Sequence, residues 1–157
     1  MPDQQPHHPD EPAVRTVAMP ADTNANGDIF GGWVLSQMDI AGGIVASKRA
    51  KGRVATVALE AMTFHKPIKV GDIVSCYGEV TRVGNTSVAV KVVTEVERRV
   101  SGDSILVTEG TLTYVALDDD GRVSAVGLQG VGCSINQATG SMLTEAIEGK
   151  TLAPIHI

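Results

Sequence analysis

Reactive side chains and paired glycines are concentrated between Asn24 and Asp39, in the segment NANGDIFGGWVLSQMD. Gly31 and Gly32 precede a stretch with helical periodicity, so the helix would begin with unpaired backbone N–H groups. Such groups bind a phosphate or polarise a carbonyl oxygen. A P-loop is excluded because no Lys-Ser or Lys-Thr follows the last glycine. A dinucleotide site is excluded because no parallel βαβ unit surrounds the glycines.

Asp39 lies two turns into this otherwise apolar helix. Its neighbours on the same helix face, Leu35, Gly42, Gly43 and Ala46, carry no charge that would neutralise it. A buried carboxylate without a partner is costly, so one interpretation is a structural hydrogen bond to nearby backbone. The other is a general base or nucleophile in an apolar cleft. The residues alone leave both interpretations open.

The remaining polar candidates also have ordinary structural interpretations. Asn24, Asn26 and Asp28 suit a tight turn or a cap. His65 stands just before Pro67, and a surface histidine at a strand bend is the expected reading. A basic run at the end of the helix either complements the helix dipole or contacts phosphate, and it comprises Lys48, Arg49, Lys51 and Arg53.

Composition limits the possible functions and partners. The formal net charge of -5 argues against nucleic acid or a membrane surface as a partner, because both need a basic field. Cys76 and Cys133 form no CxxC pair, and the spacing offers no four-ligand zinc site, so no metal is expected. The N-terminal residues MPDQQPHHPDEP lack the apolar core of a signal peptide, and no stretch is long enough to span a membrane, so we expect a cytoplasmic protein.

The elements that would position these residues form an α+β domain. A short strand at 14–19 precedes a buried helix at 33–50, and four strands follow at 54–64, 73–83, 87–100 and 104–117. Short turns between consecutive strands imply an antiparallel sheet packed on the helix. We expect a disordered tail at 1–12, one domain at 13–121, and an irregular tail at 122–157 with a possible short helix at 141–148.

Two glycines within the predicted helix lower its stability. Gly42 and Gly43 should each destabilise it by about 1 kcal/mol relative to alanine. A close approach by another backbone, from a wrapped sheet or a twin helix, would offset that cost.

Two stretches, MPADTNANGDIFGGWVLSQMDIAGGIVA and GRVATVALEAMTFHKPIKVGDIV, strongly resemble the YciA-like branch of the hotdog acyl-CoA thioesterases. The resemblance covers residues 14–121. It implies a hotdog fold, in which a curved antiparallel sheet wraps a long central helix, and hydrolysis of acyl-CoA to free acid and CoA without metal or cofactor. It also implies a homo-oligomer, a dimer at minimum and by expectation a trimer of dimers.

The resemblance assigns roles within this sequence. It places the catalytic Asp at Asp39 and its partner Asn at Asn24, contributed by opposite protomers. Phe30 stands where many relatives carry a histidine, so no histidine base is assumed. We expect Asp39 to act as general base, with a nucleophile as the alternative, while the N–H groups around Gly31 and Gly32 polarise the thioester carbonyl.

The expected substrate contacts fall into two groups. The strand 56–64 would line an acyl tunnel, through Thr56, Val57, Met62 and Phe64. Basic and hydroxyl residues would contact CoA, namely Arg53, Lys66, Thr86 and Ser87.

Two other functions compete with hydrolysis. A hotdog dehydratase would need a histidine beside a carboxylate, and His65 is the candidate. A non-catalytic acyl-CoA sensor would usually carry a DNA-binding module, and the sequence has no basic helix-turn-helix stretch.

Overall fold

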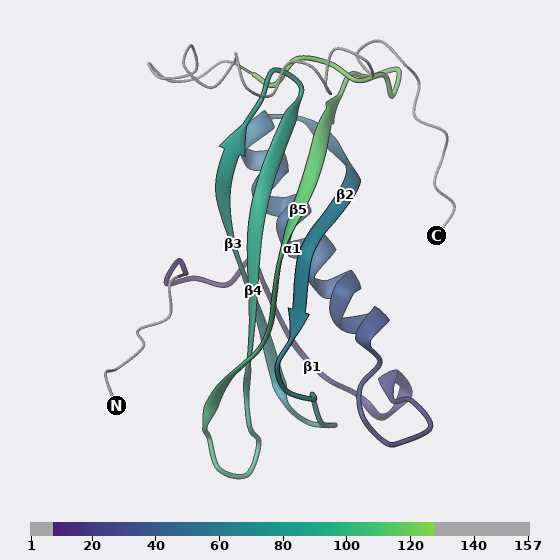
Figure 1. Cartoon of the computed structure of the whole chain (residues 1–157), viewed down its shortest axis with the longest axis vertical. Coiled ribbons are helices and arrows are strands. Elements are labelled where there is room, and N and C mark those ends of the chain that lie inside the picture. The colour runs from purple at the N-terminus through teal and green to yellow at the C-terminus, as the bar shows by residue number, and fades with distance from the viewer. Residues whose placement is uncertain (1–7, 128–157) are drawn as a thin grey trace.

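The computed structural model describes residues 8–127, in which one long helix lies along one face of a five-stranded antiparallel sheet (Figure 1). The strands run in the spatial order β1-β3-β4-β5-β2. The elements are β1 (Val14–Val17), the 3-10 turn η1 (Pro20–Asp22), α1 (Gly31–Ala50), β2 (Arg53–Phe64), β3 (Ile73–Val83), β4 (Ser87–Glu97) and β5 (Ser104–Leu117). The predicted hotdog architecture and its element order are confirmed.

The core lies between α1 and the concave face of the sheet. Alternation along β4 directs Val88, Val90 and Val92 toward the helix, where each is fully buried. The helix contributes the residues of one face, which are Val34, Met38, Ala41, Gly42, Ala46 and Ala50. Because β-branched residues fill a pleated surface well, the sheet forms a core that needs few aromatic side chains.

The helix begins and ends at positions that the sequence marks. Phe30 is the N-cap and offers no side-chain hydrogen bond, and its carbonyl accepts the N–H of Trp33 at 3.1 Å. Lys51 closes the helix in the left-handed conformation with φ 55°. The first-turn N–H groups of Gly31 and Gly32 therefore face outward without a capping side chain.

The strand β2 forms one edge of the sheet and carries an apolar surface. Between residues 8 and 127 it pairs with β5 alone, so its other edge has no partner strand in this part of the chain. Two bulges interrupt its register, and Ala61 in the second has φ 52°. Val57 and Leu59 on β2 and Ile40 and Ile44 on α1 are exposed. The helix, predicted to be buried nearly all round, thus has one uncovered apolar face in the single protomer.

The domain extends beyond the predicted boundaries at both ends. At the N-terminal end, where a disordered tail was expected, the His8 ring stacks on Tyr77 with centroids 3.7 Å apart. His8 Nε2 also lies 3.0 Å from the Glu95 carboxylate. A polar, proline-rich composition conceals this contact, because its partners are distant in the sequence.

At the C-terminal end, the packed chain continues past residue 121. The Ser124 N–H donates to the Ala116 carbonyl and the Val126 N–H to the Asn85 carbonyl, and Val123 and Val126 are buried. The possible helix at 141–148 lies outside the described residues.

Candidate active site

Asp39 projects from the middle of α1 toward the sheet and is half-buried. The Thr56 hydroxyl of β2 donates to Asp39 Oδ1 at 2.6 Å, and the Tyr114 hydroxyl of β5 lies 3.2 Å from the same oxygen. Among the described residues, Oδ2 has no hydrogen-bond donor. One carboxylate oxygen is therefore fixed, and the other is left to act on a substrate or a water molecule.

Tyr114 holds Asp39 at two points. Its hydroxyl also lies 2.9 Å from the Asp39 main-chain carbonyl. Burial raises the pKa of the Tyr114 hydroxyl far above its ordinary value, and the negative charge of Asp39 and the hydrogen bond to it raise this pKa further. Tyr114 therefore remains a neutral donor beside the carboxylate throughout the physiological pH range.

Gly42 makes room for this tyrosine. A Cβ atom on Gly42 would lie 3.0 Å from Tyr114 Cζ and closer still to its hydroxyl oxygen. A Cβ on Gly43 would make an ordinary contact, 3.7 Å from Tyr114 Cε1. Within one protomer, the close approach predicted at these glycines is thus made by a side chain of the sheet and not by its backbone. Approach by a twin helix stays a prediction.

Asn24 organises the loop that leads into α1. Its Oδ1 accepts the backbone N–H groups of Asn26 at 2.9 Å and Asp28 at 3.2 Å. These bonds fix which end of the side-chain amide is the oxygen, so the amide NH2 is the end that points away from the loop backbone. Asn24 is half-buried, and its amide NH2 makes no hydrogen bond among the described residues.

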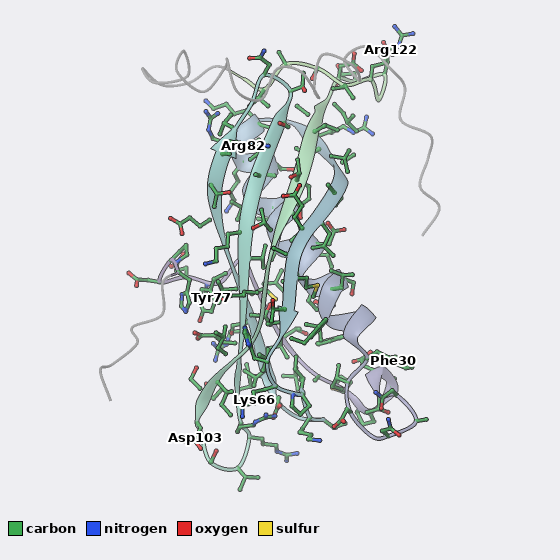
Figure 2. The ribbon with its side chains drawn as sticks, in the orientation of Figure 1. Phe30, Lys66, Tyr77, Arg82, Asp103 and Arg122 are labelled. Atoms are coloured by element: carbon green, nitrogen blue, oxygen red, sulfur yellow. The ribbon has the colours of Figure 1, made fainter. Side chains whose placement is uncertain are left out.

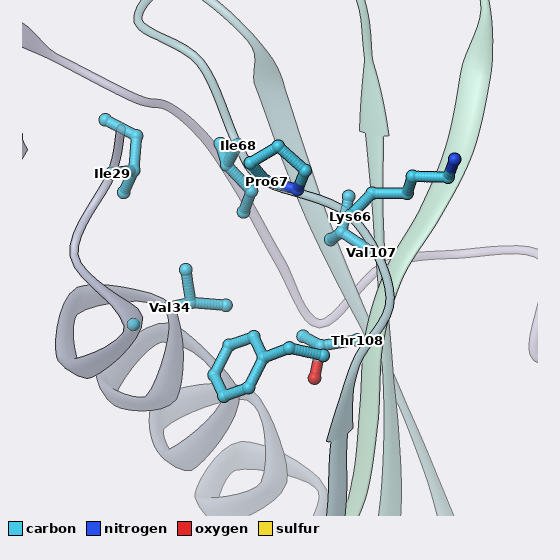
Figure 3. Close-up of a pocket in the computed structure, with 9 residues that line it drawn as sticks. Ile29, Val34, Lys66, Pro67, Ile68, Val107 and Thr108 are labelled. Carbon is cyan, nitrogen blue, oxygen red and sulfur yellow. The ribbon is translucent and has the colours of Figure 1, made fainter. Parts of the chain in front are cut away.

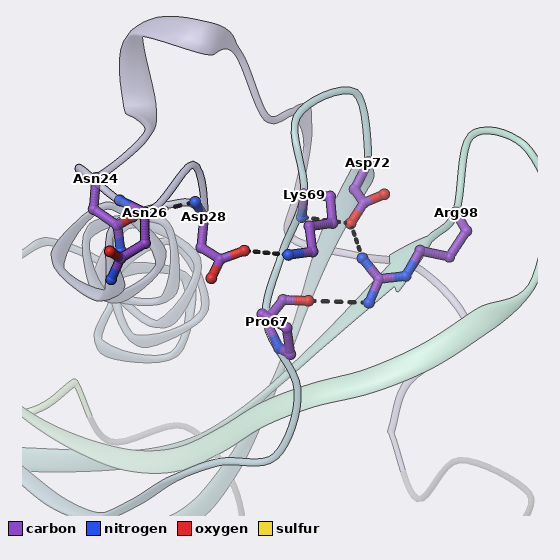
Figure 4. Close-up of polar contacts among 7 residues, drawn as sticks. All are labelled: Asn24, Asn26, Asp28, Pro67, Lys69, Asp72 and Arg98. Atoms are coloured by element: carbon purple, nitrogen blue, oxygen red, sulfur yellow. Dashed lines mark hydrogen bonds and ion pairs between the residues drawn. The ribbon is translucent and has the colours of Figure 1, made fainter.

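An ion-pair chain fastens this loop to the turn between β2 and β3 (Figure 4). Asp28 pairs with Lys69, the Lys69 N–H donates to Asp72 at 2.8 Å, and Asp72 pairs with Arg98. Arg98 also donates to the Pro67 carbonyl at 3.0 Å. Asp72 is buried, so its pairing with Arg98 satisfies a charge that would otherwise be costly. Asp28 therefore has a structural role, because its ion pair with Lys69 holds the loop in place.

The candidate residues fall into two groups within one protomer. Asn24, Gly31 and Gly32 gather at the N-terminal end of α1. Asp39 follows Gly31 by two turns, which is about 12 Å along the helix axis. A thioester carbonyl bound at the glycines is therefore out of hydrogen-bond reach of Asp39 in the same chain.

A pocket of about 200 Å³ opens beside the first turn of α1 (Figure 3). Gly31 and Val34 form one wall, and a Cβ on Gly31 would meet the Phe64 ring at 3.5 Å. The Lys66 side chain extends away from the apolar residues. The remaining lining residues are Ile29, Pro67, Ile68, Val107 and Thr108.

Other predicted contacts are distributed along the molecule. Figure 2 shows Lys66 toward the end of the molecule that also carries Phe30, the N-cap of α1. Thr56 contacts Asp39, so it belongs to the carboxylate's surroundings as well as to the strand predicted to line a tunnel. Met62 is half-buried in the second β2 bulge, while Val57 and Arg53 are exposed.

The prediction that Thr86 and Ser87 contact CoA needs correction. Thr86 is fully buried and Ser87 is 5% exposed, at the turn between β3 and β4. The Thr86 carbonyl accepts the Ala116 N–H at 2.8 Å, which draws the turn onto β5. Their hydroxyls are therefore enclosed by the protein and cannot reach a bound ligand.

Tyr114 is the residue at this site that sequence reasoning missed. It stands in the alternating pattern of β5, where an aromatic side chain suggests core packing alone. The two adjacent helical glycines indicated a close neighbour, but nothing in the sequence singled out Tyr114 as that neighbour.

Within residues 8–127, no cluster of histidine, cysteine and acidic side chains is arranged to hold a metal ion. In the same part of the chain, no helix combines the length and hydropathy needed to cross a membrane. Cys76 is buried, and burial raises the pKa of its thiol to about 11, so this thiol is not an activated nucleophile.

Two family models match the sequence. The thioesterase superfamily model matches residues 26–101. A model described as the NifU-like N terminal domain matches residues 64–156. That second range includes β3, β4 and β5, which pair with β1 and β2 in one continuous sheet, so no separate domain begins at residue 64.

Curated relatives and solved structures agree with the first match. The acyl-CoA thioester hydrolase YciA of Salmonella typhimurium is 49% identical over 123 residues, covering 76% of this chain and 92% of the relative. The hexameric thioesterase y2039 from Yersinia pestis is 48% identical with a TM-score of 0.74, covering 80% of this chain and 100% of that one.

A third protein, HI0827, is described as a hexameric broad specificity acyl-coenzyme A thioesterase and was solved with one aspartate replaced by alanine. It is 49% identical with a TM-score of 0.73, covering 75% of this chain and 87% of that one. The fold, the site and these similarities together show that the chain belongs to the hotdog-fold acyl-CoA thioesterase family.

Proposed function

We propose that this protein hydrolyses acyl-CoA thioesters to a free carboxylic acid and CoA, at sites shared between protomers of a homo-oligomer. The observation that carries the reaction is the 49% identity to the Salmonella hydrolase over 92% of that enzyme's length. The half-buried Asp39 carboxylate, with one oxygen fixed and one open, supports the assignment of the catalytic group.

The separation of the two groups of residues along α1 supports a site that is shared between protomers. Asn24, Gly31 and Gly32 lie about two helical turns from Asp39 in the same chain, so a second protomer must supply one of the two groups. The open β2 edge and the exposed apolar face of α1 offer a surface for pairing. HI0827 and y2039 are both hexameric, which supports a trimer of such dimers.

In the reaction, the N–H groups of Gly31 and Gly32 donate to the thioester carbonyl oxygen, and the Asn24 amide orients the carbonyl or the water. Asp39 from the partner removes a proton from water, whose oxygen attacks the carbonyl carbon. The tetrahedral intermediate then expels CoA thiolate, which takes up the proton. In the alternative, the Asp39 carboxylate attacks the carbonyl carbon directly and CoA thiolate is expelled, after which water hydrolyses the resulting anhydride and restores the carboxylate.

The competing functions find less support. A dehydratase would require His65 beside a carboxylate, but His65 is exposed at the bend after β2, and its side chain makes no hydrogen bond to a carboxylate among the described residues. A sensor would have no need for a carboxylate held by two hydroxyl donors. We propose Arg53 and Lys66, both exposed, as the contacts to CoA phosphates.

Thiol release from a panel of acyl-CoAs tests the reaction directly, and absence of turnover with every acyl-CoA would overturn it. Asp39→Ala and Asn24→Ala should each remove most turnover while the oligomer stays folded. Asp39→Asn should be as damaging as Asp39→Ala if the negative charge performs the chemistry. Near-normal turnover in Asp39→Asn would instead make Asp39 a structural residue.

Mixing the two inactive variants tests the shared site. Co-refolding equal amounts of Asp39→Ala and Asn24→Ala chains gives about half heterodimers, each with one intact site. Activity should return to roughly a quarter of the wild-type value. Heterodimers that are identified by mass and remain inactive would show that the two residues do not meet across an interface.

A further inference from the structure

Arg98 binds both ends of the turn that joins β2 to β3 (Figure 4). Its Nη2 group donates to the Pro67 carbonyl at 3.0 Å, and its Nη1 group pairs with Asp72 Oδ2. The same carboxylate oxygen accepts the Lys69 N–H at 2.8 Å, and the Asp72 N–H donates to the Lys69 carbonyl at 3.1 Å. A planar guanidinium makes two such contacts in a fixed geometry. Arg98 therefore sets the shape of this turn.

The two ion pairs of the chain differ in burial. Asp72 is 3% exposed, so its charge needs Arg98, and removing Arg98 would destabilise the fold. The second pair joins Lys69 to Asp28, whose side chains are 55% and 34% exposed. An exposed ion pair contributes little to the free energy of unfolding, because water screens it. The second pair therefore affects where the loop lies more than it affects the stability of the fold.

The loop that Lys69 holds carries Asn24. The Asn24 N–H donates to the Asp28 carbonyl at 2.7 Å, and Asn24 Oδ1 accepts the Asp28 N–H at 3.2 Å. Beside these bonds, the Ile29 N–H donates to the Ile68 carbonyl of the turn at 3.1 Å. Asn24 is thus bonded at two points to the residue whose carboxylate Lys69 holds. A displacement of Asp28 would pass directly to the Asn24 amide.

We propose that the turn bound by Arg98 positions the Asn24 amide for catalysis, with Lys69 as the link; the proposal rests on the thioesterase function above. In that mechanism the amide orients the thioester carbonyl or the water. Misplacing such a group by about 1 Å can cost on the order of a hundredfold in rate. Arg98 and Lys69 are positioning residues, because they act through the loop and not on the substrate.

Lys69→Met tests the link, because it keeps most of the apolar stem and removes the charge. With the acyl-CoA that wild type hydrolyses fastest, kcat should fall roughly three- to tenfold, while KM and the melting temperature stay near their wild-type values. Arg15→Met is the matched control. Arg15 forms a similarly exposed ion pair with Glu97 at 3.5 Å, on β1 and β4 and outside the Asn24 loop, so kcat should not change.

Three further variants distinguish positioning from a general loss of structure. Asp28→Lys should lower kcat as Lys69→Met does, and the Asp28→Lys/Lys69→Glu chain, which restores the pair with reversed charges, should recover much of the loss. In an Asn24→Ala background, followed by single-turnover thiol release, Lys69→Met should cause no further loss, because the group that it positions is absent. Arg98→Lys keeps the charge but cannot make both contacts, and it should also lower kcat.

The outcomes separate this proposal from the proposed function. A normal kcat in Lys69→Met would overturn the link, and so would an equal further loss in the Asn24→Ala background. A raised KM with unchanged kcat would make Lys69 a contact to CoA and would also overturn it. If Arg98→Lys does not fold, Lys69→Met alone decides the question. A wild-type chain that is inactive on every acyl-CoA would overturn the thioesterase function itself.

Discussion

Two hydroxyl donors make Asp39 an unusually well-oriented carboxylate for a half-buried position. Thr56 and Tyr114 come from different strands, yet both reach Oδ1. Fixing one oxygen orients the other, and such pre-organisation lowers the cost of reaching a reactive geometry. In the proposed mechanism, Thr56 and Tyr114 are positioning residues, and the carboxylate performs the chemistry.

Removing either hydroxyl should therefore lower kcat. A hydrogen bond to a charged group contributes about 1.5–3 kcal/mol, so Tyr114→Phe and Thr56→Val should each reduce kcat by roughly tenfold or more. KM should change little, because both hydroxyls are already hydrogen-bonded to Asp39. Steady-state thiol-release kinetics measure both parameters.

Thr56→Ser is the matched control for this prediction, because it keeps the hydroxyl and removes only a methyl group. It should retain most of the wild-type kcat. If Thr56→Ser is as slow as Thr56→Val, the loss arises from packing and the hydroxyl has no role in orienting Asp39.

At the scale of elements, the contact between α1 and β5 depends on one glycine. Gly42→Ala places a methyl group against the Tyr114 ring, which is fully buried and hydrogen-bonded and cannot move away freely. Overpacking of this kind costs about 1–3 kcal/mol, more than the gain of about 1 kcal/mol in helix propensity. The melting temperature should fall by several degrees in a circular dichroism melt.

Gly43→Ala provides the comparison within the same helix. The added Cβ meets Tyr114 only at an ordinary contact distance of 3.7 Å, so the propensity gain should dominate and the melting temperature should rise or stay constant. Equal behaviour of the two variants would contradict the role of Gly42 as the space for Tyr114.

Periodicity explains why the elements could be predicted from sequence. The alternation of apolar and polar residues predicted β3 and β5 at the bounds that the structure shows. Helical spacing of apolar residues predicted the start of α1 to within two residues. Asp39 could be singled out as a carboxylate in an otherwise apolar helix, whereas Asn24 was assigned a role only through the family resemblance. Tyr114 could not be singled out, because its contact with Asp39 joins residues far apart in the chain, and β5 alternation gives no sign of it.

The burial of Thr86 and the docking of His8 were missed for the same reason. A hydroxyl residue in a short turn suggests exposure, but this turn is closed by the hydrogen bond from Ala116 and by the Val126 N–H bond to Asn85. A polar N-terminal segment suggests disorder, but Tyr77 and Glu95 provide a stacking surface and an acceptor. Local composition carries no information about such distant partners.

For the whole molecule, the apolar surface on β2 and α1 implies assembly. Exposed Val57, Leu59, Ile40 and Ile44 lie on an open sheet edge and the neighbouring helix face, where solvent exposure would favour aggregation of a free monomer. Covering this surface with a second protomer would also complete the proposed site. Assembly and activity should therefore be lost together.

Leu59→Glu should separate the protomers, because burying an unpaired carboxylate in the interface is costly. Light scattering should show smaller particles, and thiol release should fall with them. Val100→Glu is the matched control: Val100 is 99% exposed in the turn between β4 and β5, and its substitution should leave both properties unchanged. A fully active monomeric Leu59→Glu variant would contradict the shared site.

The first turn of α1 carries the chain's single tryptophan, Trp33, directly after Gly31 and Gly32. Its half-buried indole packs against the core beside the cradle proposed for the thioester carbonyl. All tryptophan emission therefore originates from one place, the first turn of α1. The protein carries a built-in fluorophore there, and binding of an acyl-CoA at the proposed cradle should change its emission without an added label.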